Sequence, residues 1–66
     1  MYLLIWGPNG SLIDKLGRSM AAYPGKGRRH AIEFNSVLSA KEWIDKSKHF
    51  TPEEMSMVII VKEMKP

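Results

Sequence analysis

Cysteine is absent from the 66-residue sequence, which excludes disulfide bonds and thiolate metal sites. Long apolar runs are absent too, since the longest, Tyr2 to Trp6, is far shorter than the roughly 20 residues of a membrane-spanning helix. No basic stretch precedes that run, as one would in a secretory signal. We therefore expect an intracellular, cytoplasmic protein with no membrane partner.

The composition is that of a small folded domain. Apolar residues make up 44% and charged residues 26% of the chain, which is typical of globular proteins and excludes a disordered tail. We expect one domain over residues 1–66. A core of this size stabilises a fold by only about 3–5 kcal/mol, so close packing or a partner subunit must replace the missing disulfides.

Acidic residues are missing between positions 15 and 30, and this stretch holds the whole positive excess of the chain. It carries five fixed positive charges and no acid, whereas residues 1–14 and 31–66 are each slightly acidic. Such a basic surface can bind phosphate groups or the carboxylates of another protein. The candidate partner-binding residues are Lys15, Arg18, Lys26, Arg28, Arg29 and His30.

Three strands are expected. Tyr2–Trp6 is apolar at every position, and Met57–Val61 is apolar and rich in β-branched side chains. A half-exposed strand at an edge of the sheet is expected over 29–35, where apolar and polar residues alternate. Gly7 to Gly10 predicts a tight turn after the first strand, because Asn-Gly accepts positive φ.

Two capping boxes predict helix starts. The first, from Ser39 to Glu42, predicts a helix over about 39–48. The second, from Thr51 to Glu54, leaves room for only about one helical turn before the last strand.

Residues 12–22 have two interpretations. Leu12, Leu16 and Met20 lie four apart, which is typical of one helical face. Gly17 costs such a helix about 1 kcal/mol relative to Ala, and the return strand of a hairpin is the alternative. The helical interpretation predicts an α+β fold with a small three-stranded sheet, in the order strand, helix, strand, helix, strand.

Strands that are apolar on both faces need cover on both sides of their sheet. The helix over 39–48 covers one side, and a helix over 12–22 would cover the other. If residues 12–22 are not helical, we expect a second copy of the chain to cover the open face. A homodimer is therefore the structural alternative.

The Gly7–Ser11 segment, GPNGS, resembles the opening of the phosphate loop in nucleotide-binding cassette ATPases. That loop continues with glycine, lysine and serine or threonine, which bind phosphates and magnesium. Here the next residues are Leu12, Ile13 and Asp14, so we expect a turn and no nucleotide site.

Catalytic and metal-binding patterns are missing. His30 and His49 are 19 residues apart, with no paired Cys or Asp at ligand spacing, and the serines have no base beside them in sequence to activate them. We expect no enzymatic activity, no cofactor and no metal.

The expected function is that of a small non-enzymatic binding or regulatory module. A protein partner with an acidic surface is the first choice, met through the basic loop, the edge strand over 29–35, or both. Nucleic acid, held by phosphate contacts from the 15–30 region, is the alternative. Small basic proteins of this class include those that phages direct against host machinery, an analogy of size and class alone.

Overall fold

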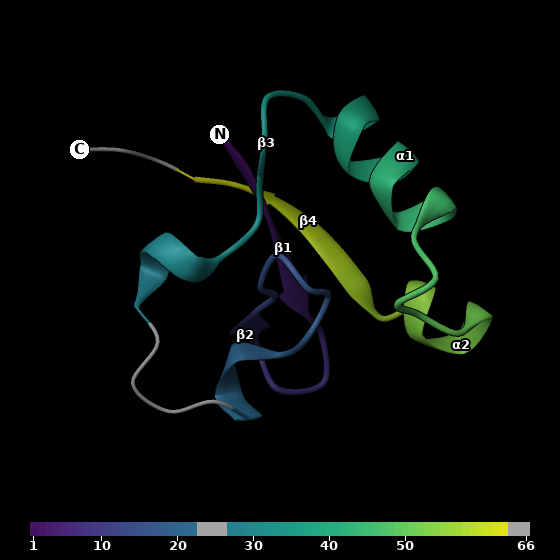
Figure 1. Cartoon of the computed structure of the whole chain (residues 1–66), viewed down its shortest axis with the longest axis horizontal. Coiled ribbons are helices and arrows are strands. Elements are labelled where there is room, and N and C mark those ends of the chain that lie inside the picture. The colour runs from purple at the N-terminus through teal and green to yellow at the C-terminus, as the bar shows by residue number, and fades with distance from the viewer. Residues whose placement is uncertain (23–26, 64–66) are drawn as a thin grey trace.

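The computed structural model describes residues 1–22 and 27–63, which form an antiparallel sheet with helices packed against it (Figure 1). This arrangement confirms the α+β class. The strands are β1 (Tyr2–Trp6), β2 (Ser11–Leu12), β3 (Glu33–Phe34) and β4 (Val58–Lys62). The helices are α1 (Val37–Lys46) and α2 (Pro52–Met55), and the 3-10 turns are η1 (Met20–Ala22) and η2 (Arg28–His30).

Strand β1 lies at the centre of the sheet. Strand β4 pairs with it antiparallel over its whole length, from Tyr2 opposite Lys62 to Trp6 opposite Val58. The other side of β1 is shared by β2 at one end and β3 at the opposite end. The expected three-stranded sheet is therefore wrong in count and order, because a fourth, two-residue strand follows directly on β1.

The segment after β1 forms a hairpin, so the helix expected over 12–22 is wrong. Gly10 takes a positive φ of 70°, and its amide donates to the carbonyl of Trp6 at 2.8 Å. The chain then returns along β1, where the amide of Ile13 donates to the carbonyl of Leu4 at 3.0 Å. The expected tight turn is confirmed, and it leads into a strand.

Two residues explain why the chain turns again instead of entering a helix. The buried Asp14 carboxylate accepts hydrogen bonds from the amides of Leu16 and Arg18, both at 2.9 Å, which closes a tight turn. Gly17 adopts a φ of 79°, in the left-handed region that glycine tolerates and a right-handed helix excludes. The spacing of the apolar residues is thus compatible with a hairpin and a turn.

We expect Asp14→Ala to lower the free energy of unfolding by about 2 kcal/mol, because two backbone amides lose a buried acceptor. Asp14→Asn should be milder, since an amide oxygen can still accept from both backbone groups. Chemical denaturation followed by circular dichroism measures both variants. Equal losses in the two would mean that the negative charge, and not the turn, stabilises this segment.

Of the edge strand expected over 29–35, only β3 forms a strand. Residues 28–30 form the η2 turn instead, in which the amide of Ala31 donates to the carbonyl of Arg28 at 3.0 Å. The strand predicted from the alternating pattern is therefore absent over most of the predicted range. Local hydrogen bonds replace the ladder at residues 28–30, and the next residues pair with the segment after β2, where the amide of Ile32 donates to the carbonyl of Ile13 at 3.0 Å.

Helix α1 begins earlier than the helix expected over 39–48. Its N-cap is Ser36, whose hydroxyl accepts the amide of Ser39 at 3.1 Å, so Ser39 lies inside the first turn. The second capping box is confirmed, because Thr51 and Glu54 exchange side-chain-to-backbone hydrogen bonds at the start of α2. Helix α2 is a single turn and leads into β4.

The core lies between the sheet and the helices. Leu4 from the central strand and Ala40 from α1 have no exposed surface. The buried cluster consists of Leu4, Ile13, Ile32, Ala40, Ile44 and Phe50.

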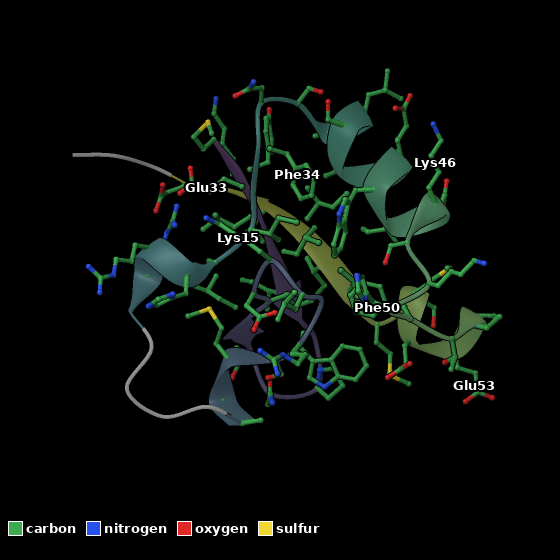
Figure 2. All side chains as sticks on the ribbon, viewed as in Figure 1. Lys15, Glu33, Phe34, Lys46, Phe50 and Glu53 are labelled. Atoms are coloured by element: carbon green, nitrogen blue, oxygen red, sulfur yellow. The ribbon has the colours of Figure 1, made fainter. Side chains whose placement is uncertain are left out.

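Aromatic rings close one side of this core. Trp43 of α1 lies 5.9 Å from Phe34 and 6.0 Å from Phe50, measured between ring centroids, and stacks on His49 at 5.6 Å. Figure 2 shows Phe34 and Phe50 in the space between the sheet and the helices. The rings thereby join β3, α1 and the segment before α2.

The opposite face of the sheet has thinner cover. In Figure 1, α1 and α2 lie on one side of the β1–β4 pair and the η2 turn lies on the other. Leu3 on β1 is only 6% exposed, but Ile59 on β4 is 50% exposed. The expectation that both strands are covered on both faces is therefore wrong for β4, because no helix forms over 12–22 to cover it.

Candidate functional site at a free sheet edge

Arg28 is the most constrained residue of the basic stretch. Its guanidinium donates two hydrogen bonds to Glu63, both at 2.7 Å, and one to Glu33 at 2.9 Å. The bonds to Glu63, and then the bond to Glu33, raise the pKa of Arg28 above its ordinary value. Arg28 therefore ties η2 to β3 and to the residue after β4, and two carboxylates balance its charge.

The remaining basic candidates are in different surroundings. Arg18 also has an acidic partner, because its Nε lies 3.4 Å from Oδ2 of the buried Asp14. Lys15 and Arg29 are exposed, and His30 is half-buried. Lys26 lies outside the described residues. Two of the candidate partner-binding residues thus have acidic partners within the chain itself.

Metal ligands are not gathered anywhere in the described ranges. Within residues 1–22 and 27–63, no group of three or more His, Cys, Asp or Glu side chains is placed to hold a metal ion. None of the helices in that part of the chain has the length and apolar character needed to cross a membrane.

The sheet has a free edge along β4, since β1 is its only neighbour among the described strands. In an antiparallel pair, the backbone groups of successive residues point alternately toward the neighbouring strand and away from it. The carbonyl of Met57 accepts from the amide of Gly7, and the amide of Glu63 donates to the carbonyl of Met1, both at 2.9 Å. The backbone N–H and C=O groups of the odd-numbered residues of β4 thus point toward β1. The residues whose N–H and C=O groups point away from β1 are Val58, Ile60 and Lys62.

The side chains of this strand are nearly all apolar. Val58 and Ile60 pack against the core cluster, and Ile59 and Val61 point to the opposite face. Lys62 is the one charged side chain in β4. Edge strands are usually protected by charges, proline or a bulge, and one terminal lysine is weak protection for four apolar residues. An edge of this kind suits the addition of a further strand.

A groove of about 260 Å³ lies between β4 and α1, beside the free edge. Its floor is apolar, with one base and one acid from α1 among its walls. The residues that line it are Lys41, Ile44, Asp45, Met55, Val58 and Ile60. The groove can hold side chains that a strand paired to β4 would direct toward the helix.

The sequence pointed to a free edge over 29–35 and missed the one at β4. A signal was present, because Met57–Val61 is uniformly apolar and Lys62 is the first charge after it. That pattern equally fits a central strand, and only the strand order places it at the edge.

Comparison with protein-family models, with curated proteins and with solved structures finds no match. The geometry and chemistry of the β4 edge are therefore the guide to function.

Proposed function

We propose that the chain is a non-enzymatic, regulatory protein-binding module whose free β4 edge accepts a strand from a partner. The observation that carries this proposal is the row of outward backbone groups at Val58, Ile60 and Lys62, flanked by apolar side chains. In such interfaces main-chain hydrogen bonds supply affinity, and pockets for alternate side chains supply specificity. The groove beside α1 supports the proposal because it borders the same edge.

We expect the partner to bind at the β4 edge of the sheet and not at the basic stretch. The expectation of an acidic partner rested on five available charges, and Arg18 and Arg28 are held by carboxylates of the chain itself. Lys15 and Arg29 remain exposed, and surface charges of this kind alter association rates more than affinity.

Affinity capture from a nuclease-treated lysate of the source cells tests the edge. Lys62→Pro removes one outward amide and no bond to β1, so we expect capture of the partner to fall by about fivefold or more. Lys62→Ala keeps that amide and is the matched control, which should capture nearly as much as the parent. If Lys62→Pro captures normally while Arg29→Ala loses the partner, the basic stretch is the interface.

Nucleic-acid binding through the 15–30 region is the alternative function. Three to five phosphate contacts predict that the logarithm of the binding constant on duplex DNA falls with log salt with a slope of about −3 to −4.5. We expect a shallower slope, because Arg18 and Arg28 are engaged within the chain. Fluorescence anisotropy of a labelled duplex measures it. A steep slope that flattens when Lys15 and Arg29 are both replaced by Ala would favour the nucleic-acid function.

A further inference from the structure

We propose that the strand accepted by β4 is β4 of a second copy of the chain, paired antiparallel about a two-fold axis at Ile60. The inference rests on the proposed function, because it names the occupant of the same edge. The sequence predicted a second copy of the chain over the open face of the sheet if residues 12–22 were not helical, and the structure shows a hairpin there. We place the second copy at the edge instead, because the backbone and side chains of β4 are complementary to themselves there. An isologous contact of this type gives a closed dimer.

The backbone alternation selects the register. With Ile60 opposite Ile60, Val58 lies opposite Lys62 of the second copy, so every outward residue of one strand faces an outward residue of the other. A register shifted by one residue would set outward groups against residues already bonded to β1. A shift by two residues leaves one outward residue of β4 beyond the end of the second strand. The register centred on Ile60 pairs all three outward residues.

The side chains agree with this register on both faces. On the face away from α1, the half-exposed Ile59 lies opposite Val61 of the second copy and gains an apolar neighbour. On the helix face, Lys62 lies opposite Val58 of the second copy, beside the groove that Asp45 lines with Val58. Lys62, the one charged residue of the strand, thus lies near the Asp45 carboxylate of the second copy. On the other face, apolar side chains of the two copies lie beside each other.

Sedimentation equilibrium over a concentration series tests self-pairing. We expect the parent chain to form a dimer and Lys62→Pro to raise its dissociation constant about tenfold or more, because the two-fold axis removes two hydrogen bonds at once. Lys62→Ala keeps the backbone donor and should weaken the dimer less. Circular dichroism confirms that each variant is folded.

A second pair of variants does not depend on proline being tolerated in β4. Ile59→Lys places a charge on the exposed face of the edge strand, and Leu38→Lys makes the same kind of change on α1, where Leu38 is 67% exposed. We expect the dissociation constant to rise about tenfold for Ile59→Lys and to stay unchanged for Leu38→Lys. Both positions are exposed enough for the monomer fold to survive.

Introduced cysteines report the register, because the chain has none of its own. When Ile59→Cys and Val61→Cys chains are mixed and oxidised, we expect the mixed 59–61 disulfide to dominate. These residues face each other as a non-hydrogen-bonded pair, with Cα atoms about 4.5 Å apart. Dominant 59–59 or 61–61 disulfides would overturn the register.

The two proposals fail in different ways. A parent chain that stays monomeric at every concentration overturns self-pairing, while lysate capture with Lys62→Pro still decides whether the edge binds another protein. A dimer that neither Lys62→Pro nor Ile59→Lys weakens uses another surface, which overturns the inference as well. A dimer weakened by both variants supports self-pairing through the β4 edge.

Discussion

Leu4→Ala is expected to unfold much of the protein at room temperature. Leu4 has no exposed surface, lies on the central strand and belongs to the core cluster. Truncating a buried leucine costs about 2–5 kcal/mol, and a core of this size supplies only about 3–5 kcal/mol. The loss is therefore comparable with the whole stability. Denaturant titration followed by circular dichroism measures it.

Leu38→Ala is the matched control, because it removes the same atoms from a side chain that is 67% exposed on α1. We expect the free energy of unfolding to change by no more than about 0.5 kcal/mol. If the two substitutions were equally damaging, α1 would face the sheet with a different side and the assigned core would be wrong.

Gly17→Ala is expected to destabilise the fold by about 2 kcal/mol or more. The left-handed conformation at this position costs a residue with a β-carbon about 1–2 kcal/mol. The added carbon would also lie 2.6 Å from Cβ of His49, so His49 must move from its stack on Trp43. The sign of this change in stability distinguishes the two interpretations, because in a helix over 12–22 the same substitution would stabilise the fold by about 1 kcal/mol.

Gly10→Ala separates backbone strain from the steric clash. Gly10 has a similar φ of 70°, but an added β-carbon would meet no atom within 4 Å beyond its own residue and its two chain neighbours. We expect a loss of about 1 kcal/mol, smaller than the loss at Gly17. A higher denaturation midpoint for Gly17→Ala than for the parent would instead restore the helical interpretation of residues 12–22.

Local patterns predicted the parts of the fold that local interactions determine. The turn at Gly10 and the capping box at Thr51 need only their neighbours in sequence, and both are present in the structure. The apolar run at Tyr2–Trp6 predicted a strand, but not the strands that pair with it. The hairpin was harder to predict, because the spacing of its apolar residues fits a helix as well. The Asp14 carboxylate favours the turn over the helix by accepting hydrogen bonds from amides further along the chain. The spacing of apolar residues carries no information about these bonds.

The candidate site depended more strongly on contacts between distant residues. Arg28 looked available for a partner, but Glu63 binds it from 35 positions away. The free edge arises because β1 is the one described strand that pairs with β4, which the apolar pattern of Val58–Lys62 does not reveal. Charge composition therefore pointed to the basic stretch, and the strand order points to the edge.

Amide hydrogen exchange along β4, measured by NMR, tests the free edge most directly. At a dilution where the chain sediments as a monomer, we expect slow exchange at Ile59 and Val61, whose amides face β1, and fast exchange at Ile60 and Lys62. Raising the concentration should then slow Ile60 and Lys62 as the second copy pairs with the edge. Slow exchange at all four amides in the monomer would show that another part of the chain covers β4, and would contradict the account.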